Sequence, residues 1–349
     1  MDAARNQVWI LAGFIFSVGV LTACAQKSAP SAAKASTKFA PLVLTGSIPM
    51  PKVQGRIDHM SFDPQGRLFV SALGNDSEEV LDLSAGTLAH TIAGIPRPQG
   101  VAYVADVNKL FVGSDEGKLY IYDATSYNLI TSLDFGDDVD NLRYDLASKQ
   151  VYVGYGDERT GAIAAVDAAT NQRASNEFKL GAHPESFQLA TSGPNIYVNL
   201  PDLKQIAVIN RKTGSVSRWP VSFNANFPMA LDEAGHRLFV ATRSPARFAV
   251  FDTDSGNMVT TRPCVQGSDD MFFDRARKRI YVVGGEGFID VFQQRDPDHY
   301  EQAARIPSGV GARTAGYFGK GRKGFEIFYV AVPASTRSAA EVLLYTVQD

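Results

Sequence analysis

The sequence has few of the residues and none of the motifs that define several common classes of protein. Only two of its 349 residues are cysteine, and Cys-x-x-Cys, His-Glu-x-x-His and Gly-x-Ser-x-Gly are all absent, so nothing indicates a zinc ribbon, a zincin or a serine-hydrolase elbow. The net charge of −3 leaves no extended basic footprint for nucleic acid. The one Lys/Arg-dense run, residues 320–323, lacks the setting of a phosphate loop and is expected to be a solvated hairpin loop.

The N-terminal segment is predicted to direct export. Residues 8–20 form an apolar run that is too short to span a bilayer comfortably but suits the hydrophobic part of a signal peptide. The tetrapeptide at residues 21–24 resembles the lipobox of bacterial lipoproteins, which implies cleavage before Cys24 and lipidation of that residue. An ordinary signal peptide and a retained short anchor are the alternatives. Ala25 after the cysteine implies, by the same resemblance, the outer membrane.

These observations divide the chain into three parts. Residues 1–23 are the predicted signal peptide, residues 24–40 a lipidated cysteine with a flexible tether, and residues 41–349 the folded domain. The expected location is the periplasmic side of a bacterial envelope, with membrane contact through the lipid anchor alone. Cys264 is then left without a disulfide partner and is expected to be packed as a small apolar residue.

The folded part is organised as a repeat. An aromatic residue flanked by aliphatic ones returns seven times at steps of about 41 to 48 residues, at 68–70, 110–112, 151–153, 196–198, 238–240, 280–282 and 328–330. Repeats of roughly this length that consist of short strands are typical of β-propellers, in which each repeat is one four-stranded blade. The sequence therefore predicts an all-β, seven-bladed propeller, with antiparallel strands that we denote a to d within each blade.

The chain ends indicate how the ring closes. The seventh repeat ends at Val342–Tyr345, a third strand, with no fourth strand after it. Leu42–Ile48 is a strand with no partner in its own repeat, so we expect it to supply the missing fourth strand of the last blade. That arrangement removes an open seam.

The repeat resembles a known family. Residues 110–133 carry Val-Gly after the aromatic residue and Tyr-Ile-Tyr-Asp on the third strand, and they look like the YVTN-type β-propeller repeat of bacterial envelope proteins, although no copy matches the tetrapeptide fully. The resemblance implies a seven-bladed propeller and export, but it assigns no catalytic residue because the family is functionally diverse. WD40 repeats are disfavoured, since no copy ends in Trp-Asp and Trp219 is the only tryptophan of the propeller region.

Alignment of the repeats places a set of polar residues where the first strand of each blade meets the central channel. The outermost position holds Asp58, Gln99, Asp140, Glu185, Phe227, Asp269 and Arg313, and the next position inward holds His59, Gly100, Asn141, Ser186, Pro228, Asp270 and Thr314. Converging carboxylates must be hydrated, protonated, paired or metal-bound. The site is predicted to be Asp58, His59, Gln99, Asp140, Asn141, Glu185, Asp269, Asp270 and Arg313.

Two classes of function are compatible with this site. One is a ligand-binding or protein-interaction scaffold, which presents an acidic channel face to a small ligand or an envelope partner. The alternative is a lactonase-like hydrolase, in which Asp58, Asn141, Glu185 and Asp270 would hold Ca²⁺ or Mg²⁺ and His59 and Glu185 are the candidate catalytic residues. A polar, water-filled funnel is the plain explanation of the same residues, and the sequence does not decide whether the protein is an enzyme.

Overall fold

The computed structural model describes residues 40–317 and 326–349. The predicted signal peptide, the lipobox with Cys24, the tether as far as residue 39 and the basic run 320–323 therefore lie outside the described residues. Within the described ranges the only helix is one 3-10 turn, η1 (Leu73–Asn75), and no helix has the length and hydrophobicity needed to cross a bilayer.

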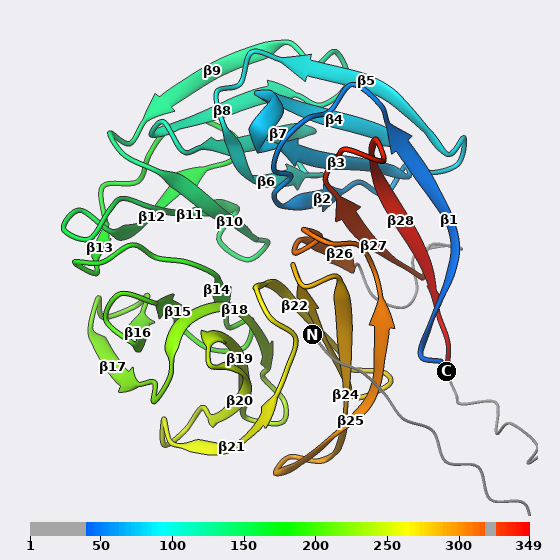
Figure 1. Cartoon of the computed structure of the whole chain (residues 1–349). Helices are drawn as coiled ribbons and strands as arrows, with labels where there is room; N and C mark the ends of the chain where they lie inside the picture. Colours follow the sequence, from blue (N-terminus) through cyan, green and yellow to red (C-terminus); the bar gives the residue numbers. More distant parts are fainter. Residues whose placement is uncertain (1–39, 318–325) are drawn as a thin grey trace, which may run out of the picture. The chain divides into compact units, whose positions relative to one another are not determined.

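The described residues form seven antiparallel sheets of four strands, arranged in a ring (Figure 1). Both the all-β class and the seven blades are confirmed. The first three blades are β2 (Met60–Phe62), β3 (Arg67–Ala72), β4 (Ser77–Asp82) and β5 (Thr87–Ala93); β6 (Pro98–Val104), β7 (Lys109–Ser114), β8 (Lys118–Asp123) and β9 (Leu129–Asp134); β10 (Val139–Asp145), β11 (Gln150–Tyr155), β12 (Ala162–Asp167) and β13 (Phe178–Lys179). The next three are β14 (Phe187–Leu189), β15 (Asn195–Leu200), β16 (Gln205–Asn210) and β17 (Val216–Pro220); β18 (Asn224–Asp232), β19 (Arg237–Ser244), β20 (Ala246–Asp252) and β21 (Met258–Pro263); β22 (Ser268–Asp274), β23 (Arg279–Gly284), β24 (Phe288–Asp296) and β25 (His299–Pro307).

The seventh blade joins the two ends of the propeller, as predicted. It consists of β26 (Ala315–Tyr317), β27 (Ile327–Val332), β28 (Ala340–Val347) and β1 (Leu42–Met50), in which β1 lies beside β28 (Figure 1). Leu42 pairs with Val347 and Met50 with Ala340. Leu42, Ile48 and Met50 are buried whereas most of β1 between them is exposed, so one face of the strand anchors it.

The hydrophobic core is divided among the junctions between blades. Seven clusters of buried side chains each join two neighbouring blades. The aromatic residue of every repeat, on the second strand, is buried: these are Phe69, Phe111, Tyr152, Tyr197, Phe239, Tyr281 and Tyr329. Because both faces of that strand pack against other blades, its sequence is continuously apolar.

The first strand of several blades is irregular at the end where the candidate site lies. The pairing register shifts between Pro98 and Val101 in β6, between Val139 and Leu142 in β10, and between Ser268 and Asp270 in β22. Such bulges change the direction of side chains on the bulged strand. The shifts span Gln99, Asp140 with Asn141, and Asp269, which are predicted site residues.

Candidate functional site

A polar cavity of about 300 Å³ lies at one end of the channel, and we call it the mouth cavity. Its lining is almost entirely charged or polar. The lining residues are Arg56, His59, Arg97, Gln99, Asp115, Asp138, Asp140, His183, Glu185, Phe227, Arg243 and Asp269.

Most of the predicted site residues meet at this cavity or beside it. His59, Gln99, Asp140, Glu185 and Asp269 line it. Asp58 is buried next to it, where Arg56 Nη2 lies 2.8 Å from Asp58 Oδ2. Asn141 is buried and donates a hydrogen bond of 3.0 Å to Asp140. Asp270 lies deeper in the channel. Arg313 is not part of the lining, and its guanidinium lies near Gly285.

Three arginines in the lining were not predicted from the sequence. Arg97 pairs with Asp115, Arg243 with Asp269, and Arg56 with Asp58. Arg243 also stacks on the ring of Phe227, 3.4 Å from its centroid, and donates to the carbonyl of Ser268. Arg56 and Arg97 each lie two residues before an aligned channel position, and Arg243 lies at the end of β19, the second strand of its blade, so the two aligned positions did not include them.

The pairing leaves three carboxyl groups without an arginine partner: Asp138, Asp140 and Glu185. Burial, reinforced by the negative charge of Asp140, raises the pKa of Asp138 to about 7. Burial together with the charges of Asp140 and Asp269 raises the pKa of Glu185 well above its usual range. The mouth cavity therefore holds more carboxylates than its arginines neutralise, and some of them retain protons at neutral pH.

His183 lies among these carboxyl groups in a fixed orientation. Its Nδ1 is 2.6 Å from the carbonyl oxygen of Gly156 and must be the donor in that hydrogen bond, because a carbonyl only accepts. Its Nε2 then faces Asp140, with Oδ2 at 3.8 Å. Burial opposes the charged ring, but the carboxylate of Asp140, together with the negative charges of Glu185 and Asp138, outweighs it and raises the pKa of His183 to about 10.

His59 occupies the point where the mouth cavity meets a deeper cavity of about 170 Å³. Its Nδ1 is 3.4 Å from Asp270 Oδ1, and its Nε2 is 3.7 Å from Asp58 Oδ1 and 3.8 Å from Asp140 Oδ1. Burial disfavours the charge, yet these carboxylates, Asp270 above all, raise the pKa of His59 to about 10. His59 is thus a cation that lies between carboxylates. In this state the predicted catalytic candidate has no lone pair with which to act as a general base.

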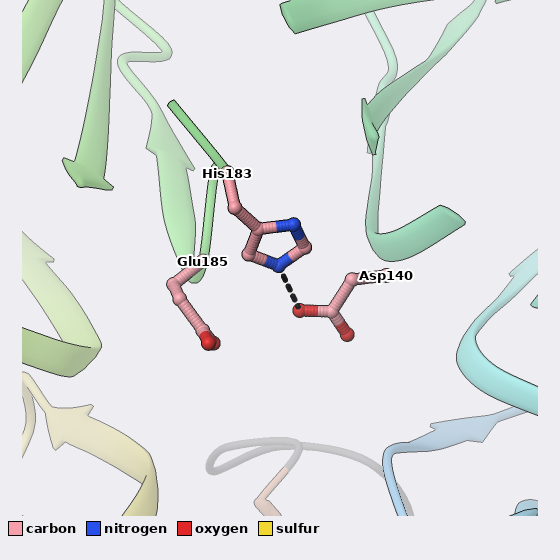
Figure 2. A group of neighbouring side chains, drawn as sticks. All are labelled: Asp140, His183 and Glu185. Carbon is pink, nitrogen blue, oxygen red and sulfur yellow. Dashed lines mark ion pairs between the residues drawn. The ribbon is translucent and has the colours of Figure 1, made fainter. Parts of the chain in front are cut away.

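One group of side chains has the arrangement of metal ligands. A carboxylate oxygen of Asp140, a ring nitrogen of His183 and a carboxylate oxygen of Glu185 all lie within 4.8 Å of one another (Figure 2). Among the described residues, no other group of three His, Cys, Asp or Glu side chains meets this condition. Of the predicted metal ligands it contains only Glu185, because Asp58 pairs with Arg56 and Asp270 with His59.

The three side chains come from two adjacent blades. Asp140 lies on the bulged part of β10, whereas His183 and Glu185 belong to the segment between β13 and β14. The amide of Glu185 donates to the carbonyl of Asn199, which extends the ladder between the fourth blade's first two strands. Figure 2 shows the imidazole and the two carboxylates directed toward a common space.

Two other sequence interpretations concern residues away from the cavity. Residues 252–256, Asp-Thr-Asp-Ser-Gly, have the opening spacing of a calcium loop but lack its later acidic ligand. Asp252 accepts hydrogen bonds from the amides of Asp254 and Ser255, so the segment is a turn. Cys264 is buried and free, and burial raises the pKa of its thiol to about 12.

Comparison with known proteins supports the fold. No family model and no curated protein sequence matches the chain. Many solved structures resemble it, and three of them serve as examples. A chain in the crystal structure of a mitotic checkpoint complex is 14% identical with a TM-score of 0.73, and the alignment covers 95% of this chain and 100% of that one. A chain of the Kuenenia stuttgartiensis hydrazine synthase is 15% identical with a TM-score of 0.70, covering 88% and 98%. The structure of U3-55K is 11% identical with a TM-score of 0.71, covering 84% and 97%. At these identities the likeness shows a seven-bladed β-propeller and no more.

Proposed function

We propose that this chain is a binding protein whose mouth cavity holds a small ligand that carries positive charge, such as an amine or a metal cation. The observation that carries the proposal is that five carboxyl groups, all at least partly buried, line the cavity beside only three arginines, so the remaining balance depends on the protons of His59 and His183. One cavity oxygen, Oδ2 of Asp269, is also buried without a hydrogen-bond donor in the described part of the chain, although Arg56 Nη2 lies 3.7 Å from it. A bound cation would replace the protons that Asp138 and Glu185 otherwise retain, and would give this oxygen a closer partner.

Calorimetric titration of the purified full chain with spermidine, Ca²⁺ and Zn²⁺ tests this proposal. The wild type should bind at least one of these probes, and Asp140→Asn should weaken binding by more than about tenfold, because truncating one partner of a buried charge pair typically costs 2–5 kcal/mol. Asp254→Asn is the matched control, since Asp254 is an exposed carboxylate in a distant turn. Binding of none of the three probes at millimolar concentration, or equal binding by Asp140→Asn, would refute the proposal.

A second cationic ligand that would suit the acidic residues of the mouth cavity is the basic surface of an envelope protein. Asp137 lies beside the mouth cavity, where its carboxylate accepts a hydrogen bond from Thr160, and it does not line the cavity. Asp137→Asn should therefore weaken capture of a protein partner while leaving the affinity for spermidine unchanged. Loss of spermidine binding in Asp137→Asn would count against this division of the surface.

We further propose that the chain is a YVTN-type propeller of the bacterial envelope, lipidated at Cys24 and anchored on the periplasmic side of the outer membrane. The lipobox resemblance and the repeat pattern support it. Radiolabelled palmitate should enter the wild type and not Cys24→Ser, and membrane fractionation should move that variant to the soluble fraction. Equal labelling of both proteins would exclude lipidation at this residue.

A metal-dependent hydrolase acting on lactones is the second candidate function. The grouping of Asp140, His183 and Glu185 favours it, because an ion held there would be open to the cavity and able to polarise a carbonyl oxygen. The protonated state of His59 does not suit the role of general base, and Glu185 would serve as a ligand of the ion. Lactone turnover that Glu185→Gln abolishes while the fold stays intact would support this function, and absence of turnover by a metal-loaded protein would dismiss it.

A further inference from the structure

We infer that the cation of the mouth cavity is a divalent transition-metal ion, such as Zn²⁺, bound by Asp140, His183 and Glu185. This inference rests on the proposed function, since it specifies the ligand of the same cavity. It changes the kind of ion expected from the sequence, which pointed to Ca²⁺ or Mg²⁺.

The donor set carries the choice of ion. Ca²⁺ takes six to eight oxygen ligands and Mg²⁺ prefers carboxylates with several waters, whereas imidazole nitrogen suits Zn²⁺ and its transition-metal neighbours. The cavity offers one imidazole nitrogen and two carboxylates within 4.8 Å of one another. Three protein ligands with a fourth position open to solvent are the pattern of catalytic or exchangeable zinc sites.

His183 is oriented as a metal-binding histidine usually is. Such a histidine donates its other ring N–H to a carboxylate or a backbone carbonyl, which fixes the ring and directs the remaining nitrogen at the metal. Here Nδ1–H donates to the carbonyl of Gly156, and Nε2 is directed at the space between Asp140 and Glu185 (Figure 2). A metal ion would take the place of the proton on Nε2.

Glu185 is the ligand without a competing partner. Its carboxylate has no hydrogen bond and no ion pair within the described ranges, although it is partly buried. Arg243, the nearby guanidinium, is held by Asp269, the carbonyl of Ser268 and the ring of Phe227. The arginine is therefore fixed away from the position that the ion would occupy.

A second group of the cavity supports the site independently of the three ligands. Asp269 is more than nine-tenths buried, yet its Oδ2 has no hydrogen-bond donor among the described residues, and its ion-pair partner, Arg56 Nη2, lies 3.7 Å away, beyond hydrogen-bond distance. A metal-bound water would supply that donor. Zinc–ligand bonds of about 2.0 Å in a tetrahedron place ligand atoms about 3.3 Å apart. The ligand atoms, which lie within 4.8 Å of one another, therefore need to approach by up to about 1.5 Å, which rotations about side-chain bonds can supply.

The test compares metal ions and matched histidine variants. Purified full chain stripped of metal is titrated with Zn²⁺, Ca²⁺ and Mg²⁺, bound metal is counted by elemental analysis, and the visible spectrum of the Co²⁺ form reports on the coordination. We expect one Zn²⁺ per chain and binding of Ca²⁺ and Mg²⁺ weaker by more than about 100-fold. His183→Gln and Glu185→Gln should each weaken Zn²⁺ binding by more than about 100-fold, because even changes outside the ligand shell cost 10- to 100-fold.

His299→Gln is the matched control. His299 also faces a carboxylate, Asp296, at 2.8 Å, but it is exposed and no third ligand is grouped with it. Its Zn²⁺ affinity should equal that of the wild type. Thermal unfolding establishes that each variant is folded, and if His183→Gln fails to fold, Glu185→Gln decides, since its side chain makes no hydrogen bond in the described structure.

The outcomes separate this inference from the proposed function. Binding of spermidine without Zn²⁺ would overturn the inference and leave the proposed function standing. Zn²⁺ binding that survives in both His183→Gln and Glu185→Gln, or Ca²⁺ binding as tight as that of Zn²⁺, would also overturn the inference. Failure of all these probes would refute both.

Discussion

Replacement of Gly161 by alanine is expected to destabilise the protein and disrupt the mouth cavity together. Gly161 lies beneath the segment that leads to His183, where its carbonyl accepts hydrogen bonds from the amides of Leu180 and Gly181. A β-carbon at this position would lie 1.8 Å from the carbonyl oxygen of Ala182 and 2.3 Å from its carbonyl carbon. The atoms in the way belong to the backbone, so no side-chain rotation relieves the overlap.

The size of the effect follows from the distance. Ordinary contacts between such atoms are about 3.5 Å, so the Ala182 peptide would have to move by about 1.5 Å or more. Overpacking by one methyl group in a closely packed site typically costs 1–3 kcal/mol, and a rigid backbone neighbour places this case at about 3 kcal/mol or above. The movement would also carry the adjacent His183 out of its present position, and we expect Zn²⁺ affinity to fall by more than about 100-fold.

Gly193 provides the control for this change. A β-carbon there would meet only the Ala190 side chain, at 3.9 Å, and its backbone does not require glycine. Gly193→Ala should therefore stay within about 0.5 kcal/mol of the wild type. Urea unfolding and Zn²⁺ titration of both variants form the assay. If Gly161→Ala were as stable as Gly193→Ala and bound Zn²⁺ equally well, the close approach of Gly161 to Ala182 would not exist in solution.

Two further predictions concern the fold. Ile48→Ala in β1 should lower the free energy of unfolding by about 2–5 kcal/mol, because Ile48 is fully buried. Leu44→Ala in the same strand should lower it by less than about 0.5 kcal/mol, because Leu44 is 54% exposed. Equal urea midpoints for the two variants would contradict the closure of the ring by β1. Glu233 accepts hydrogen bonds from the amides and hydroxyls of Thr191 and Ser192, and although burial acts in the opposite direction, these bonds lower its pKa to about 2. This pKa lies below the unfolded value of about 4.3, so the stabilisation is present above pH 4.3 and is lost as the pH falls through 2. Glu233→Gln should therefore cost about 1–2 kcal/mol at pH 7 after allowance for solvent screening, about half as much at pH 3 and little at pH 2. A cost independent of pH would argue against these hydrogen bonds.

The architecture could be predicted from the sequence because it depends on a pattern that repeats. A buried aromatic residue such as Phe111 or Tyr281 marks the second strand of each blade, and the unmatched strand at Leu42–Ile48 indicated how the ring closes. The channel position of Asp140, Glu185 and Asp269 followed from the same repeat. Because the pattern occurs in seven repeats, a wrong strand assignment in one repeat is corrected by comparison with the others.

The chemistry of the site was less accessible because it depends on features that do not repeat. The bulge between Val139 and Leu142 changes the direction of the Asp140 side chain, and no residue type in β10 predicts a bulge there. Arg56 and Arg243 reach the cavity from outside the aligned first strands, so the predicted acidic face also contains cations. The predicted metal ligands Asp58 and Asp270 pair with Arg56 and His59, whereas His183 lies two residues before the aligned position of Glu185 and was not in the predicted ligand set.

The pairing of β1 with β28 also sets the order in which the molecule can be completed. During synthesis from the N-terminus, β1 emerges first, and its partner emerges only after almost three hundred intervening residues. Six blades can form from neighbouring segments of the chain while the seventh still lacks its fourth strand. The slow step of folding should therefore be the long-range pairing of β1 with β28. A circular permutant that joins Asp349 to Ala40 and opens the chain between two blades would convert this encounter into a local hairpin, and it should therefore refold faster than the natural order of strands.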